Sequence, residues 1–114
     1  MSRYSRQISV KSVGPRGHSR VRNGSVEIYG HGLDSQICAL YLAGAGVGTI
    51  SCHSKVIDQV RAINSEVETL EIAEDSTDFR AVCRKETFRS KKTTELGRGS
   101  QVARDVIACF LREQ

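Results

Sequence analysis

Two glycines that follow a short apolar run have the spacing of a phosphate-binding turn. Residues 26–29 predict a strand, Gly30 and Gly32 predict a turn, and a helix is expected to begin near Ser35. In nucleotide-binding folds the first glycine makes the tight turn, the second lets the backbone approach phosphate, and a small third residue lets the helix pack on the strand. The helix N-terminus then attracts the anion. We therefore predict nucleotide contacts from Gly30, Gly32 and Ser35, with a plain tight turn as the alternative.

Two neighbouring residues of this turn oppose phosphate binding. Asp34 brings a negative charge to the place where phosphate would lie, and Leu33 adds bulk. His31 and His53 have side chains suited to acid–base chemistry, but no partner is spaced to orient either of them. We expect His31 to be a turn residue and His53 to end a strand.

The elements that would position these residues alternate between strand and helix. Ile37, Leu40, Tyr41 and Ala43 recur at helical spacing, and the helix is expected to be capped by Asp34 or Ser35 and to end at Gly44 and Gly46. The predicted order is strand 26–29, helix 35–44, strand 47–52, helix 54–63 and strand 66–72. This order predicts an α/β fold with right-handed crossovers and a parallel sheet.

The pattern is weaker after residue 72. Residues 74–99 are polar and charged, and we expect a short helix over residues 78–84 followed by a mobile basic loop. Residues 100–113 predict a final helix, with Ser100 as its cap and an apolar stripe along one face.

Composition bounds the class of protein. The 114 residues correspond to one domain, and a net charge of +4 with a pI near 9.1 favours anionic partners. The basic residues concentrate in residues 16–22 and 84–92, so a nucleic-acid-binding module is one alternative, although aromatic residues make up only 5%.

The four cysteines are not spaced as a zinc or redox pair, and Cys38 and Cys109 are expected in the core. With no apolar leader or membrane-length segment, the expected location is cytoplasmic.

Several motifs in order resemble one enzyme family. Arg3-Tyr4-Ser5-Arg6-Gln7-Ile8 opens the chain, the glycine turn follows, and Leu40-Tyr41-Leu42-Ala43-Gly44-Ala45-Gly46-Val47-Gly48 comes next. Together they resemble the ThiF/MoeB/HesA family, which includes the ubiquitin-activating enzymes. That family opens with Arg-Tyr-x-Arg-Gln and continues with Gly-x-Gly-Gly-Leu-Gly and Tyr-Leu-Ala-x-Ala-Gly-Val-Gly. The resemblance covers roughly the first half of the chain.

The resemblance implies a Rossmann-like nucleotide-binding domain, truncated here to residues 1–114 with a basic N-terminal arm at residues 1–24. Members are usually dimers that use ATP to adenylate the C-terminal glycine of a small ubiquitin-like or sulfur-carrier protein. The opening arginine reaches into the neighbour's ATP site, a role that falls on Arg6, with Arg3 beside it. A guanidinium suits this role because it is always charged and binds phosphate oxygens in a fork. The alternative is a merely solvated basic arm.

Other family positions are altered. Ser54 stands where the family has an acidic residue that binds the ribose. It is a candidate cofactor-binding residue that can make one hydrogen bond, but one hydroxyl cannot replace a carboxylate's paired acceptors. The family segment with a second phosphate-binding arginine is missing. Asp75-Ser76-Thr77-Asp78 resembles the segment that holds Mg²⁺, which would make Asp78 the metal-linked residue, with a helix cap as the alternative. The zinc-binding cysteine pairs of many members are absent, so no zinc is expected.

The retained opening arginines and the altered site positions together favour a non-catalytic or weakly active homologue of the adenylyltransferases. Such a chain would act as a homo- or heterodimer partner, supplying Arg6 in trans to a longer family member. A minimal active ATP-dependent adenylyltransferase and a basic nucleic-acid-binding module are the alternatives.

Overall fold

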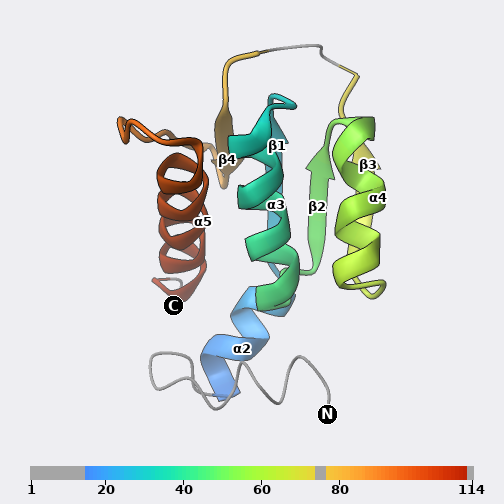
Figure 1. Cartoon of the computed structure of the whole chain (residues 1–114). Helices are drawn as coiled ribbons and strands as arrows, with labels where there is room; N and C mark the ends of the chain where they lie inside the picture. The colour runs from blue at the N-terminus through green and yellow to red at the C-terminus, as the bar shows by residue number, and fades with distance from the viewer. Residues whose placement is uncertain (1–14, 74–76, 113–114) are drawn as a thin grey trace.

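The structure, a computed structural model, describes residues 15–73 and 77–112 (Figure 1). Arg3, Arg6 and Asp75 therefore lie outside the described residues. Four helices and five strands are described, in the order α2 (Pro15–Arg22), β1 (Ser25–Tyr29), α3 (Leu33–Ala45), β2 (Thr49–Cys52), α4 (Ser54–Ile63), β3 (Glu68–Glu71), β4 (Arg80–Cys83), β5 (Glu86–Phe88) and α5 (Glu95–Leu111).

The strands form one mixed sheet in the order β3-β2-β1-β4-β5. β1 pairs with β2, and β2 with β3, in parallel, which confirms the predicted α/β fold and its parallel strand–helix–strand arrangement over these three strands. β4 pairs antiparallel with β1, and β5 antiparallel with β4. The sheet is thus parallel on one side of β1 and antiparallel on the other.

The helix expected over residues 78–84 was a wrong prediction, because this segment contains β4. Ala81 and Cys83 are buried while Val82 between them is partly exposed, which is the two-residue alternation of a strand. Cys83 pairs with Glu86 across a tight hairpin. Part of the expected basic loop is therefore β5, and the remainder leads into α5.

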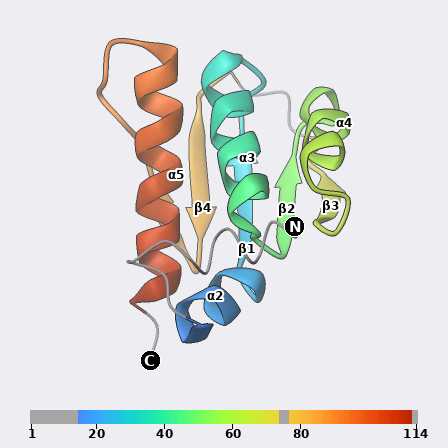
Figure 2. The same cartoon turned by 60° about the horizontal axis from the view of Figure 1, so that its bottom comes forward.

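Three helices cover one face of the sheet. α3, α4 and α5 lie side by side in front of the strands in Figure 1, and α2 lies at their lower end in Figure 2. Val26 and Ile28 point from β1 into the layer between sheet and helices, and Ser25 and Glu27 alternate with them on the exposed side. Val102, Val106 and Phe110 supply the apolar stripe of α5, which confirms the predicted final helix, and Cys38 and Cys109 lie in the core as expected.

Two predicted helix starts were placed too late. α3 begins at Leu33 after Gly32, which makes no side-chain capping bond, and α5 begins at Glu95, where the Thr94 side chain accepts a hydrogen bond from the Gly97 N–H. Ser100 lies inside α5, and its Oγ donates to the Leu96 carbonyl at 2.7 Å. The four residues that precede Ser100 are polar or glycine apart from Leu96, so they carry no apolar periodicity from which their helix could be recognised.

The end of α3 was predicted from its glycines. Gly46 has φ 92° and ends the helix, because an L side chain rarely adopts this left-handed conformation. Gly44 lies within the last turn and leaves the helix intact. Within the described residues, no helix has the length and apolar character needed to cross a membrane.

α5 approaches α3 closely at a glycine. A β-carbon on Gly99 would lie 2.6 Å from the Asp34 carbonyl oxygen and 2.9 Å from the Ile37 side chain. Glycine at this position therefore permits the contact that holds α5 beside the start of α3.

Replacing Gly99 with alanine tests this contact. We expect Gly99→Ala to lower the free energy of unfolding by about 1–3 kcal/mol, because the added methyl group overpacks the space between the two helices. Urea unfolding followed by circular dichroism measures the change. Gly44→Ala is the matched control, since nothing lies within 4 Å of a β-carbon there; it should be neutral or stabilising by about 0.5–1 kcal/mol. Equal stability of the two variants would contradict the proposed close packing.

Candidate functional site

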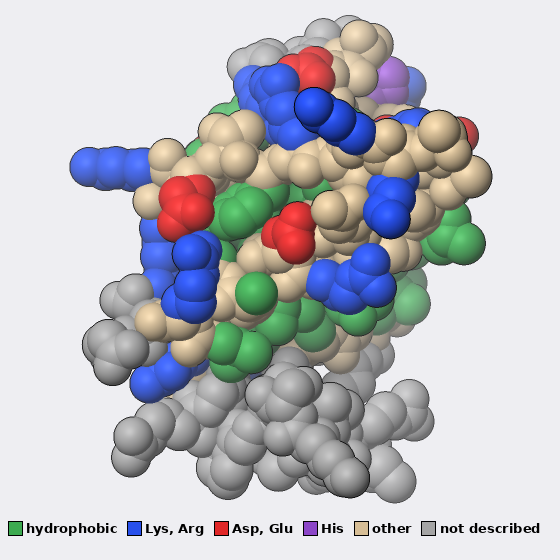
Figure 3. Space-filling model, turned by 90° about the vertical axis from the view of Figure 1, so that its left-hand side faces the viewer, with side chains coloured by type: hydrophobic (Ala, Val, Ile, Leu, Met, Phe, Trp, Pro, Cys, Tyr) green, Lys and Arg blue, Asp and Glu red, His purple; other side chains and the backbone are tan. Residues whose placement is uncertain are grey.

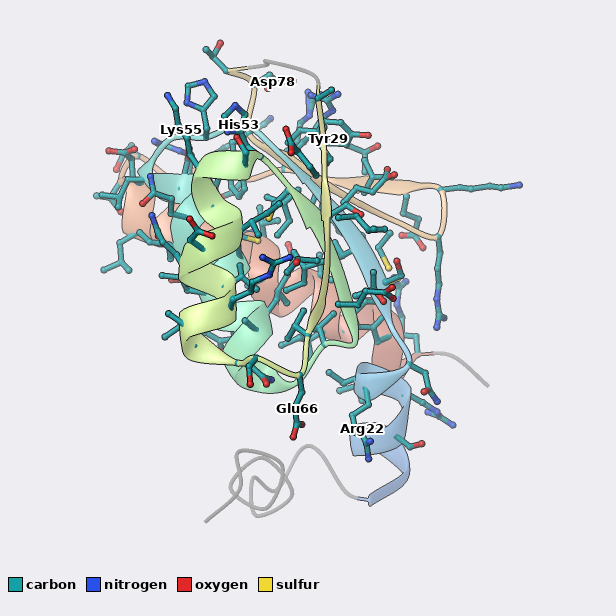
Figure 4. All side chains as sticks on the ribbon, turned by 90° about the vertical axis from the view of Figure 1, so that its right-hand side faces the viewer. Arg22, Tyr29, His53, Lys55, Glu66 and Asp78 are labelled. Atoms are coloured by element: carbon teal, nitrogen blue, oxygen red, sulfur yellow. The ribbon has the colours of Figure 1, made fainter. Side chains whose placement is uncertain are left out.

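The glycine turn lies at the carboxyl ends of the parallel strands. β1 ends at Tyr29, and the turn leads directly to the N-terminus of α3. Figure 4 shows Tyr29, His53, Lys55 and Asp78 at this end of the molecule, while Glu66 and Arg22 lie at the opposite end. In open α/β sheets, ligands bind outside the carboxyl ends of the strands where the strand order reverses, and here it reverses at β1. This end is the candidate site.

Gly30 has the backbone conformation expected for the tight turn. Its φ is 98°, and a β-carbon there would lie 2.7 Å from Ser35 Oγ. Ser35 is fully buried, and its Oγ donates to the Tyr29 carbonyl at 3.3 Å. The small side chain thus lets the start of α3 pack against the end of β1, as the sequence predicted for the third position.

A carboxylate of the chain itself lies at the N-terminus of α3. Asp34 Oδ1 accepts a hydrogen bond from the Ser35 N–H at 2.8 Å. This N–H is one of the first-turn donors that would otherwise face a bound anion. The Asp34 side chain is only 14% exposed, so its charge lies close to the helix end rather than in bulk water.

Arg98 holds this carboxylate in place. Its Nε lies 3.1 Å from Asp34 Oδ2, and its Nη1 donates to the carbonyls of Lys92 and Thr93 at 3.1 and 3.2 Å. One guanidinium therefore joins the start of α3 to the loop that precedes α5. A phosphate at the turn would have to displace a carboxylate that already has both an amide and a guanidinium as partners.

Gly32 is close to a second acidic side chain. A β-carbon on Gly32 would lie 3.3 Å from Asp34 Oδ1 and 3.8 Å from Glu95 Oε2. The space that the missing side chain opens is thus bordered by two carboxylates. Leu33, the next residue, is 51% exposed and adds apolar bulk at the same point. Negative charge at this distance from an incoming phosphate opposes its binding.

The second strand–helix turn contains His53 and leads to Ser54, which stands at the family's ribose position. Ser54 is exposed and is the first residue of α4. His53 caps that helix, because its Nδ1 accepts from the Lys55 N–H at 3.1 Å. The rings of His31 and His53 lie with their centroids 4.7 Å apart. His53 is thus a helix cap as well as the residue that follows β2, and the two strand–helix turns contact each other through imidazole rings.

Asp78 is paired with arginines. Its carboxylate lies 2.9 Å from Arg89 and 3.5 Å from Arg80, and its side chain is 56% exposed. It does not cap a helix, since the segment after it enters β4. Over residues 15–73 and 77–112, no group of three or more His, Cys, Asp and Glu side chains is placed to hold a metal ion.

The basic segment 84–92 runs from the tip of the β4–β5 hairpin back to the end of the molecule that holds the glycine turn, where Arg89 pairs with Asp78 and the Lys92 carbonyl accepts from Arg98. Arg84 and Lys85 form the tip of the β4–β5 hairpin with φ of 54° and 71°, and Lys91 and Lys92 are exposed before α5. Figure 3 shows lysine and arginine side chains spread over the side of the molecule that α5 and the hairpin form, with acidic side chains among them.

Known proteins that are similar to this chain include adenylyltransferases and sulfurtransferases. An adenylyltransferase and sulfurtransferase MOCS3 from Anopheles gambiae is 44% identical over 50 residues, which is 44% of this chain and 11% of that protein. The resemblance to ThiF/MoeB-type adenylyltransferases is confirmed. An adenylyltransferase and sulfurtransferase uba4 from Neosartorya fischeri is 50% identical over 48 residues, or 42% of the chain and 10% of that protein.

A longer match is to another MOCS3 protein. The MOCS3 protein of Drosophila willistoni is 40% identical over 70 residues, which is 61% of this chain and 15% of that protein. The chain thus spans only about a tenth to a seventh of the length of these relatives. No model of a protein family matches the chain.

Two residues that lie close to the glycine turn, Arg98 and Glu95, were not predicted from the sequence. Arg98 and Glu95 come from a segment predicted to be a loop, and no motif connects either one with Asp34. The only available signal was the isolated acidic residue at position 34, which in a partly buried place requires a cationic partner.

The Asp34–Arg98 pair can be tested by a double-mutant cycle. We expect Asp34→Ala, Arg98→Ala and the double variant to give a coupling free energy of about 1 kcal/mol, because the pair is partly buried and hydrogen-bonded. Urea unfolding measures each corner of the cycle. The exposed pair Glu86–Arg112, with N and O atoms 3.4 Å apart, is the matched control and should show smaller coupling. Equal coupling free energies in both cycles would contradict a larger stabilising contribution from the partly buried Asp34–Arg98 pair.

Proposed function

We propose that this chain is a non-catalytic or weakly active homologue of the adenylyltransferases that activate ubiquitin-like or sulfur-carrier proteins. In this proposal it forms a single Rossmann-like domain and pairs with a longer family member or a second copy. It contributes to the partner's ATP site through Arg6, with Arg3 beside it, rather than using a site of its own.

The observation that supports this proposal most strongly is the position of the Asp34 carboxylate. It accepts the Ser35 N–H at 2.8 Å and pairs with Arg98 at 3.1 Å. A phosphate needs the same kind of partners, namely first-turn N–H groups and a guanidinium. Since both are already engaged, ATP binding at Gly30 and Gly32 would require breaking an internal ion pair.

The ribose and metal positions support the same conclusion. Ser54 offers one hydroxyl where two ribose oxygens would need paired acceptors. Asp78 faces Arg89 and Arg80, and a hard cation such as Mg²⁺ needs several oxygen ligands free of competing cations. The residues present do not fit Mg·ATP, so no adenylation step is assigned to this chain's own turn.

The proposal predicts that the purified chain does not catalyse ATP–pyrophosphate exchange and binds Mg·ATP more weakly than about 1 mM. Asp34→Ala should tighten binding about tenfold, because it frees the Ser35 N–H and the Arg98 guanidinium. Isothermal titration calorimetry measures the affinity. Asp58→Ala removes an exposed carboxylate on α4 and is the matched control. Robust exchange by the unaltered chain would favour the minimal active enzyme and reject the proposal.

The role of Arg6 can be tested with a partner. A longer family member whose own opening arginine is replaced by alanine should lose pyrophosphate exchange, and adding this chain should restore it by at least about tenfold. Arg6→Ala should abolish the rescue, since the fork-shaped guanidinium is the group supplied. Lys11→Ala, which removes a positive charge from the same arm, is the matched control. Equal rescue by the Arg6→Ala variant would contradict the proposal.

A further inference from the structure

Two cysteines that are distant in sequence have their sulfur atoms in contact inside the core. The Sγ atoms of Cys83 in β4 and Cys109 in α5 lie 3.9 Å apart. Cys83 is 1% exposed and Cys109 is 4% exposed. This cluster is separate from the glycine turn.

The fold brings these thiols together through two periodicities. In β4, Ala81 and Cys83 point to the covered face of the sheet, where α5 packs. In α5, Cys109 belongs to the buried face together with Val102 and Val106. The contact therefore follows from the same packing that builds the core.

One side of the thiol pair is close to exposed polar groups. Cys109 Sγ lies 3.9 Å from Glu86 Oε1, and Arg112 lies 3.4 Å from Glu86 Oε2. The Glu86 and Arg112 side chains are 52% and 63% exposed. Small outward movements of these two side chains would admit a small oxidant to Cys109.

We propose that Cys83 and Cys109 form a reversible modification site, which a peroxide converts into an intramolecular disulfide between β4 and α5. The Cys109 sulfur attacks one peroxide oxygen, and the O–O bond breaks to give a sulfenic acid and water. The Cys83 sulfur then attacks the Cys109 sulfur, and the S–O bond breaks to release a second water. Two thiols lose two electrons and two protons, and one peroxide is reduced.

Burial sets the order and the speed of these steps. Burial, with the neighbouring Cys109, raises the pKa of the Cys83 thiol to about 12, so Cys83 remains protonated at neutral pH. Cys109 lies on the side of Glu86 and is the more exposed of the two, so it is the sulfur that meets the oxidant first, and Cys83 is the resolving thiol. The reaction is expected to be slow until the Glu86–Arg112 side opens.

The disulfide would join the β4–β5 hairpin covalently to α5. It closes a loop between positions 26 residues apart, which restricts the unfolded chain. We expect the oxidised protein to melt roughly 10 °C or more above the reduced protein.

Mass spectrometry of the intact chain tests the proposal directly. All four cysteines are free thiols in this structure. After treatment with one equivalent of hydrogen peroxide, alkylation under denaturing conditions should detect two thiols instead of four. Trypsin digestion without reductant should then release peptide 81–84 linked to peptide 105–112. Cys38 and Cys52 remain together in peptide 23–55, so any wrong pairing is recognised by its mass.

Variants complete the test. Cys83→Ala and Cys109→Ala should each abolish the linked peptide and the rise in melting temperature, whereas the matched control Cys52→Ala should retain both. Dithiothreitol should reverse the change. Four thiols after peroxide treatment, or a bridge that involves peptide 23–55, would overturn the proposal. The peptide assignment in the unaltered chain decides the matter even if a variant fails to fold.

Discussion

The ion pair between Asp34 and Arg98 fixes α5 to the start of α3 at the glycine turn. It works together with Gly99, whose missing side chain allows the two helices to approach. Because Arg98 also binds the carbonyls of Lys92 and Thr93, the same guanidinium orders the segment that leads into α5. The position of α5 in turn determines where β4 is covered and where Cys109 meets Cys83. One partly buried charge pair, added to the apolar packing of α5, therefore links the fold to the candidate site.

Under the proposed function, this pair also explains how the fold can remain intact although its own glycine turn does not bind nucleotide. The free N–H groups at a helix N-terminus need an acceptor, and in nucleotide-binding folds the phosphate provides it. Here Asp34 provides it from within the chain. Such a substitution stabilises the helix start by a favourable charge–dipole interaction while it makes the site less favourable for an anion. In the proposed function, a turn that does not bind nucleotide is thus compatible with a stable fold in a subunit that supports a partner.

Much of the fold could be predicted from the sequence because it is encoded locally. The alternation in residues 26–29, the glycine at position 46 and the apolar stripe of the last helix each depend on a few neighbouring residues. The β4–β5 hairpin could not be predicted, because its turn residues are Arg84 and Lys85 instead of the glycine or asparagine that normally mark such turns. The pairing of Asp34 with Arg98 spans 64 positions and depends on tertiary packing alone. The glycine spacing identified Gly30, Gly32 and Ser35 as candidate site residues, but only the structure placed the acidic side chains around them.

The amide of Ser35 is already bound to a carboxylate of the same chain, that of Asp34. The most direct measurement is a titration of the ¹⁵N-labelled protein with Mg·ATP, following the backbone amide resonances of residues 30–36. We expect the Ser35 amide resonance to keep its position up to millimolar nucleotide in the unaltered protein and to shift during the same titration of the Asp34→Ala variant. A saturable shift of the Ser35 and Gly32 amides in the unaltered protein would contradict this expectation.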